Sequence, residues 1–195
     1  MKLSPIAVYL LLFPLGSSAQ DAVPADQHQM RRLHSDPKSY IGALENPKRD
    51  LYQKPQQVIA ALGIKPGEVI ADIGAGSGYF TFRLAHHVGD KGKVYAVDVS
   101  PDMILHLNRR IRELKATNVV SILADPDDPL LPDASIDRFF FSDSWHHIEA
   151  QAKYLSLMKR MLKPGGEIVM IDFHKKDLPV GPPLQMKIAR EDVIK

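Results

Sequence analysis

Short apolar runs alternate with amphipathic segments along most of the chain after residue 56. Each apolar run has four to six residues, which is too short for a helix and typical of a buried parallel strand. The predicted strands cover residues 69–73, 94–97, 119–123, 136–141 and 167–171. Segments with apolar side chains at helical spacing predict helices over residues 56–62, 79–88, 101–114, 148–162 and 188–195. This alternation predicts the α/β class, with a doubly wound sheet of mainly parallel strands.

The first 55 residues do not share this alternation. Lys2, an apolar stretch over residues 3–15 and small residues up to Ala19 are typical of a signal peptide over residues 1–19. The apolar stretch is shorter than the ~20 residues of a spanning helix, but an uncleaved anchor or a buried helix stays an alternative. Residues 20–55 are polar and interrupted by prolines, so we interpret them as a linker and lid segment. Short helices are expected there at residues 27–33 and 40–44.

Composition and charge exclude several classes of protein. Apolar residues make up 45% of the chain, enough for a real core. A net charge of +2 without a long basic run predicts no nucleic-acid partner. The chain has no cysteine, which excludes disulfides, thiolate zinc sites, cysteine nucleophiles and lipid attachment after Ala19.

A glycine-rich turn follows the first predicted strand and opens a helix. Gly74, Gly76 and Gly78 stand at alternate positions, where the absent side chains let a ligand lie directly on the backbone. A dinucleotide fingerprint needs a further glycine at position 79, which is Tyr79. The phosphate loop of nucleotide triphosphatases needs a lysine that this turn lacks. The spacing therefore favours a different kind of nucleotide ligand.

Three acidic residues lie at consecutive strand ends. Asp72 precedes the glycine turn and would repel a pyrophosphate but attract a cation. Asp98 ends the second strand, where a carboxylate can bind both ribose hydroxyls. Asp125 follows the third strand and is placed to accept from the exocyclic amine of an adenine. Together they predict a nucleoside site for a ligand with a positively charged tail.

These segments resemble four motifs of the class I S-adenosylmethionine-dependent methyltransferases, in the small-molecule branch labelled type 11 or ubiquinone-biosynthesis-like. The resemblance rests on VIADIGAGSGYFT at residues 69–81, VYAVD at 94–98, LAD at 123–125 and LKPGGEI at 162–168. It implies a Rossmann-like sheet with strand order 3-2-1-4-5, S-adenosylmethionine as methyl donor and a small-molecule substrate. It covers roughly residues 56–175 of a methyltransferase domain predicted over residues 56–195.

The resemblance also assigns roles to individual residues. The residues implied to bind the cofactor are Asp72, Gly74, Gly76, Gly78, Asp98, Met103, Asp125, Pro126 and Asp143. Gly74, Gly76 and Gly78 would approach the methionine portion, and Met103 would pack on the adenine or ribose unless it is only a core residue. Asp143 follows the fourth strand, which lines the cofactor and substrate pocket in this family.

Methyl transfer from a sulfonium needs mainly alignment and desolvation, and a base only where the acceptor carries a proton. His146 and His147 are the candidate catalytic bases, because imidazole titrates near neutral pH. Capping of the following helix and support of the cofactor are the alternative roles for this pair. No metal site is predicted, since Asp143 is a lone acidic residue without visible companion ligands.

Two features depart from the family. The chain ends in the predicted helix 188–195, so we expect strands six and seven of the family to be absent and the sheet edge beside residues 167–171 to be uncovered. The signal peptide predicts export to the periplasm or medium, away from the cytosolic cofactor; a membrane-anchored protein with a cytoplasmic domain is the alternative. Membrane contact is predicted only if the segment is uncleaved. A non-catalytic binder of S-adenosylmethionine or S-adenosylhomocysteine is the second functional hypothesis, and a nicotinamide oxidoreductase the third.

Overall fold

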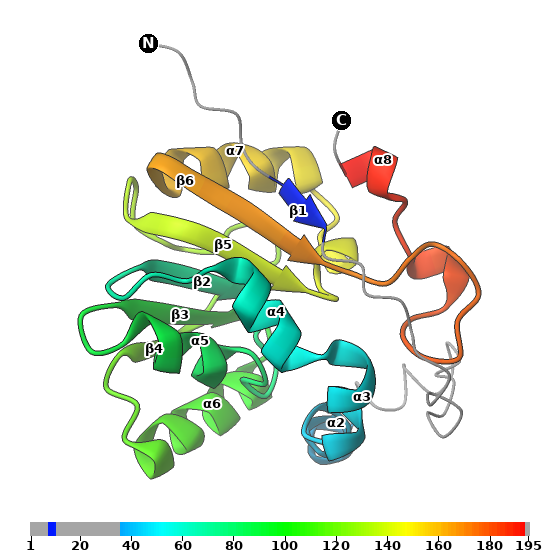
Figure 1. Cartoon of the computed structure of the whole chain (residues 1–195), viewed down its shortest axis with the longest axis horizontal. Helices are drawn as coiled ribbons and strands as arrows, with labels where there is room; N and C mark the ends of the chain where they lie inside the picture. The colour runs from blue at the N-terminus through cyan, green and yellow to red at the C-terminus, as the bar shows by residue number, and fades with distance from the viewer. Residues whose placement is uncertain (1–7, 11–35, 194–195) are drawn as a thin grey trace.

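A single parallel sheet organises the protein in the computed structural model, which describes residues 8–10 and 36–193 (Figure 1). The strands lie in the order β1-β6-β5-β2-β3-β4, and every pair is parallel. Their bounds are β1 Val8–Leu10, β2 Val69–Ile73, β3 Lys93–Asp98, β4 Val119–Leu123, β5 Ile136–Ser142 and β6 Leu162–Ile171. The five predicted strands are all present, and β4-β3-β2-β5-β6 is the predicted order 3-2-1-4-5. The α/β doubly wound, Rossmann-like fold is therefore confirmed.

The central strands are apolar on both faces because helices cover both faces of the sheet. Phe139, Phe140 and Phe141 of β5 are all fully buried. Phe140 packs in the cluster that contains Leu84, whereas its two neighbours pack in the opposite cluster with Met158. Successive strand residues point to opposite faces, so a continuous apolar run supplies both cores at once.

Helices pack on or beside this sheet (Figure 1). Their bounds are α4 Pro55–Leu62, α5 Thr81–Val88, α6 Pro101–Leu114, α7 Gln151–Met161 and α8 Arg190–Val193. α4, α5 and α6 contribute to one core and α7 to the other. Ser100 caps α6 by accepting from the Met103 amide, and Pro101 occupies the first turn, as predicted. α7 begins at Gln151 rather than at residue 148, because a short 3₁₀ helix, η3 (Trp145–His147), comes first.

A short strand covers the sheet edge that was expected to be bare. β1 pairs with β6 in parallel, with Val8 opposite Ile168 and Leu10 opposite Met170. Residues 8–10 fall inside the predicted signal peptide, whose other residues lie outside the described part of the chain. The signal peptide therefore stays a prediction. Within the described residues, no helix is long and apolar enough to cross a membrane.

The predicted linker is helical where the structure describes it. Asp36 caps α2 (Pro37–Leu44), and η2 (Pro47–Arg49) and α3 (Asp50–Gln53) follow. α2 contains the helix predicted at residues 40–44, whereas the helix predicted at 27–33 lies outside the described residues. Glu45 ties this helical segment to α6, because Arg110 Nη1 donates to its carboxylate at 2.6 Å. The segment therefore has a defined position against the domain.

Candidate functional site

A cavity of about 410 Å³ opens at the carboxyl ends of β2, β3, β4 and β5. This is the edge where open α/β sheets bind their ligands, and the volume is in the range of small-molecule sites. Most predicted site residues line it: Asp72, Gly74, Gly76, Asp98, Met103, Asp125, Pro126, Asp143 and His147. Gly78 and His146 are not among the lining residues. The sheet thus brings together residues from four separate segments of the chain.

Asp72 is a buried carboxylate at the end of β2. Its side chain accepts a hydrogen bond of 2.6 Å from Thr81 Oγ1 in the first turn of α5. Burial raises the pKa of Asp72 to about 7, against the lowering effect of the Thr81 hydrogen bond. A cation in the cavity would favour the ionised form of this group.

The glycine turn is held by β3. The amides of Gly74 and Ala75 donate to the Val97 carbonyl at 2.9 and 3.0 Å. The Gly76 amide donates to Asp98 Oδ2 at 2.8 Å, and the Ser100 amide donates to Asp98 Oδ1 at 2.9 Å. Burial raises the pKa of Asp98, and these amide hydrogen bonds lower it in part. Asp98 therefore organises the turn in addition to facing the cavity.

The glycines of the turn have positive φ and close protein neighbours. A Cβ at Gly74 (φ +72°) would lie 2.6 Å from Ser144 Cβ, and one at Gly78 (φ +87°) would lie 2.6 Å from Phe82 Cε2. Side-chain packing thus demands glycine at these two positions even without a ligand. The sequence predicted a tight turn and close ligand approach at these glycines, and the contacts with Ser144 and Phe82 are an additional requirement.

The adenine side of the predicted site is more open. Asp125 is exposed, and it forms a tight turn with Asp128 in which each amide donates to the other carbonyl. Pro126 follows it on the cavity wall. Met103 is buried, 3% exposed, and lines the cavity from α6. A lining with a buried apolar side chain and an exposed carboxylate suits a flat base with a polar edge.

The helical segment 36–53 supplies lining residues that sequence reasoning missed. Tyr40 and Leu44 of α2 and Arg49 of η2 line the cavity. The Arg49 guanidinium lies 4.3 Å from the Tyr79 ring centroid, which positions it by a cation–π contact. Nothing in the spacing of these residues relates them to the glycine turn. The packing of α2 on α6 and the contact of Arg49 with Tyr79 place them there.

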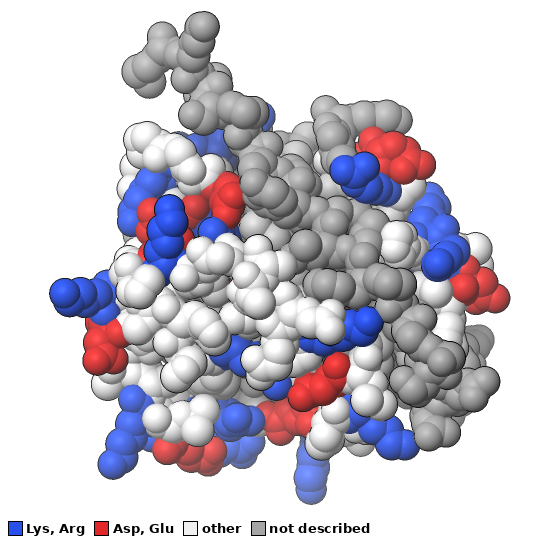
Figure 2. All heavy atoms as spheres, in the orientation of Figure 1, with Lys and Arg blue, Asp and Glu red and all other residues white. Residues whose placement is uncertain are grey.

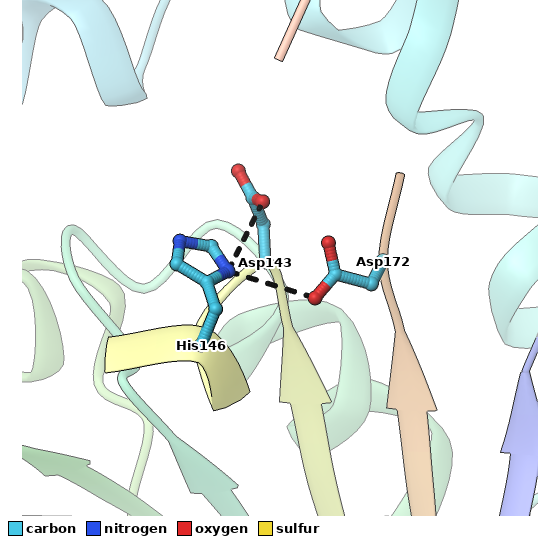
Figure 3. Close-up of side chains that lie close together, drawn as sticks. All are labelled: Asp143, His146 and Asp172. Atoms are coloured by element: carbon cyan, nitrogen blue, oxygen red, sulfur yellow. Dashed lines mark ion pairs between the residues drawn. The ribbon is translucent and has the colours of Figure 1, made fainter. Parts of the chain in front are cut away.

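The two candidate histidines have different surroundings. His147 is exposed and lines the cavity. The His146 side chain is 3% exposed, and its Nδ1 lies 3.9 Å from Asp143 Oδ1 and 3.6 Å from Asp172 Oδ2 (Figure 3). Asp143 has φ +54°, an unusual backbone conformation for a residue other than glycine. Asp172 directly follows β6, and the strand-end rule that found Asp98 could have found it.

His86 and His87 on α5 are exposed, and so is His174. Figure 2 shows acidic and basic side chains interspersed around the face it draws. The cavity itself is more one-sided, because its lining includes Asp72, Asp98, Asp125 and Asp143. Among the described lining residues, Arg49 is the one lysine or arginine. Carboxylates beside apolar walls suit a nucleoside that carries a positive charge.

The fold and this cavity define a Rossmann-like nucleoside-binding domain. Comparison with known proteins identifies the family within this class. The profile of a family described as a methyltransferase domain matches residues 64–193. The ubiquinone/menaquinone biosynthesis C-methyltransferase of a Shewanella species is 29% identical over 121 residues, which cover 62% of this chain and 48% of that protein. The chain spans about half the length of the curated relatives it matches.

Solved structures agree. A SAM-dependent methyltransferase from Aquifex aeolicus superposes with a TM-score of 0.76 and 32% identity over 81% of this chain and 84% of that chain. Phosphoethanolamine N-methyltransferase 2 from Haemonchus contortus, in complex with S-adenosyl-L-methionine, superposes with a TM-score of 0.56 and 27% identity, over 61% of this chain and 27% of that chain. The protein belongs to the S-adenosylmethionine-dependent methyltransferase family.

Proposed function

We propose that this protein transfers a methyl group from S-adenosylmethionine to a small-molecule acceptor. The observation that carries the proposal is the acidic cavity beside the glycine turn, in which Asp98 both holds the Gly76 amide and faces the ligand space. Asp98 would bind the ribose, Asp125 with Pro126 and Met103 would hold the adenine, and the turn at Gly74 to Gly76 would face the methionine portion. The relatives described as C- and N-methyltransferases support a small acceptor.

The cofactor would supply a methyl group that is already activated by its sulfonium. The residues of this chain would bind, orient and exclude water. Asp72, buried at the end of β2, would interact favourably with the positive charge of the bound cofactor. α2 and η2 would cover the ligand, with Tyr40 and Arg49 above the turn. Alignment in a dry cavity contributes most to a displacement of this kind.

His147 is the residue we propose as the base for an acceptor that carries a proton. It lines the cavity, whereas His146 is buried beside two carboxylates. His147→Gln should lower turnover by about 10²–10⁴-fold for such an acceptor, the usual contribution of a general base. The affinity for S-adenosylhomocysteine should not change.

Calorimetry with S-adenosylmethionine, S-adenosylhomocysteine and NAD tests the cofactor. We expect both sulfur nucleosides to bind and NAD to give no heat. Asp98→Ala should weaken S-adenosylhomocysteine binding by about 1–3 kcal/mol, because a buried hydrogen-bonding group loses its partner. Asp90→Asn, at an exposed loop position, is the matched control and should bind as the wild type does. A folded protein without affinity for either sulfur nucleoside would overturn the proposal.

A non-catalytic binder of the same nucleosides is the second candidate, and it rests on the prediction of export away from the cofactor's source. Tight binding of S-adenosylhomocysteine without methyl transfer to any small-molecule extract would favour it. Incorporation of radiolabelled methyl groups into an extract component would favour the methyltransferase.

A further inference from the structure

Three side chains from two neighbouring strand ends converge beside the cavity (Figure 3). Asp143 follows β5, Asp172 follows β6, and His146 lies in η3. Their ligand atoms, one from each side chain, all lie within 4.8 Å of one another. The Asp143 amide donates to the Ile171 carbonyl at 2.8 Å, which fixes the two acidic residues side by side.

A buried imidazole lies at the centre of this cluster, with its Nδ1 between the two carboxylates. The His146 side chain is 3% exposed, and within the described residues neither its Nδ1 nor Asp143 Oδ1 has a hydrogen-bond partner. Both atoms point into the space between the three groups (Figure 3). Buried polar atoms are nearly always satisfied, so such a pair indicates a missing ligand.

The distances match the size of a bound metal ion. Zinc bonds to imidazole nitrogen and carboxylate oxygen are about 2.0–2.2 Å long, so two tetrahedral ligands lie about 3.4 Å apart. His146 Nδ1 lies 3.6 Å from Asp172 Oδ2 and 3.9 Å from Asp143 Oδ1. Both gaps are too long for a hydrogen bond and within about half an ångström of this spacing.

The local charge also favours a cation. The carboxylates of Asp143 and Asp172 lie 3.9 and 3.6 Å from His146 Nδ1. Lys187 packs nearby, but its Nζ donates to the Lys176 carbonyl at 3.0 Å. A bound cation would neutralise the two carboxylates at the place where they meet.

We propose that Asp143, His146 and Asp172 form a binding site for a divalent first-row transition metal ion, of which Zn²⁺ is the best fit. One imidazole and two carboxylates suit Zn²⁺, Mn²⁺ or Fe²⁺ better than Mg²⁺, which prefers oxygen alone. Three protein ligands leave a coordination position for water or another oxygen donor. Asp143 also lines the cavity, so the ion lies at its margin. The site does not depend on the proposed methyl transfer.

Metal titration of untagged, chelator-treated full-length protein tests the site. Isothermal calorimetry with ZnCl₂, in the absence of any nucleoside, should show one high-affinity ion per chain. His146→Ala and Asp172→Ala should each weaken that affinity by at least about 100-fold, more than the loss of an outer-shell partner. His86→Ala removes an exposed histidine on α5 and should bind Zn²⁺ as the wild type does. Circular dichroism and thermal unfolding would verify that each variant is folded.

Substitution with Co²⁺ gives a readout that does not require a folded variant. The wild type should develop visible d–d absorption bands at one equivalent, and Zn²⁺ should displace them. No Zn²⁺ binding by the folded wild type would overturn the proposal and leave a protonated His146 paired with the two aspartates. Equal affinity in the wild type and in folded His146→Ala would also overturn it. Nucleoside affinity is measured separately, so the two proposals can fail independently.

Discussion

At the scale of single residues, the glycine turn carries two requirements at once. Its backbone amides donate to Val97 and Asp98 of β3 beside the cavity, and its backbone lies close to the Ser144 side chain. Ser144 Oγ donates to the Ile73 carbonyl at 2.7 Å, so this side chain cannot easily move away. The absence of a Cβ at Gly74 leaves the room that Ser144 occupies.

Gly74→Ala should therefore be more destabilising than an alanine at a glycine with positive φ and free space. Gly63 (φ +55°) serves as the control, because nothing lies within 4 Å of the place that an added Cβ would take there. Gly63→Ala should cost about 1 kcal/mol of unfolding free energy from backbone strain. Gly74→Ala should cost about 1–3 kcal/mol more from overpacking. Urea denaturation measures both, and equal losses would show that the Ser144 contact is unimportant.

At the scale of elements, α2 is held over the cavity by a small polar network on α6. Arg109 donates to His106 Nδ1 at 2.8 Å, and His106 Nε2 then donates to Glu45 at 2.9 Å. Arg110 donates to the same Glu45 oxygen. His106 is buried, so this network is worth more than an exposed ion pair. α2 has no fully buried residue of its own, and its position depends on such contacts.

Glu45→Gln should loosen α2 without unfolding the sheet. The neutral amide of glutamine keeps one oxygen that can accept from His106 and Arg110, but it loses the negative charge that attracts Arg110. We expect amide hydrogen exchange of α2 to become about 10-fold faster, while β2 and β5 exchange at the wild-type rate. Glu113→Gln, in the exposed Arg109–Glu113 pair, is the control. Unchanged exchange in α2 would mean that other contacts hold the helix.

At the scale of the whole molecule, acidic residues are concentrated where the strands end. The fold buries Asp72 at the centre of the sheet and places Asp98 and Asp143 on either side of it. Burial raises the pKa of each of these groups, to about 7 for Asp72 and Asp143. Ionisation of these carboxyl groups therefore lowers the free energy of unfolding of the ligand-free protein.

Stability of the free protein should fall as the pH rises from about 4 to above 7. A carboxyl group with a raised pKa binds a proton in the folded state that the unfolded chain releases near pH 4. Its stabilising contribution is therefore complete below the unfolded pKa and is lost as the pH passes the folded pKa. Asp72→Asn should flatten this decline and raise the free energy of unfolding at pH 8. Denaturant titrations of the wild type and Asp72→Asn across this pH range, with a chelator present, measure the free energy of unfolding. The same slope of that free energy against pH in both proteins would contradict the prediction.

Much of the fold could be predicted from the chain alone. Apolar runs of strand length and helical periodicity depend on local spacing, so β2 and β4 have the predicted bounds. The strand order was implied by the family resemblance and is confirmed. The start of α7 could not be predicted in this way, because η3 comes before it and its Trp145 is buried in a core built from several strands.

The sequence by itself determined the glycine turn and the carboxylates at successive strand ends, because parallel strands of one sheet bring their carboxyl ends to one edge. Only the tertiary structure decided which residues cover that edge. Tyr40 and Arg49 reach the cavity because α2 packs on α6, and Asp172 meets His146 because β6 lies beside β5. These contacts join residues far apart in the chain, and no local pattern encodes the distance between them.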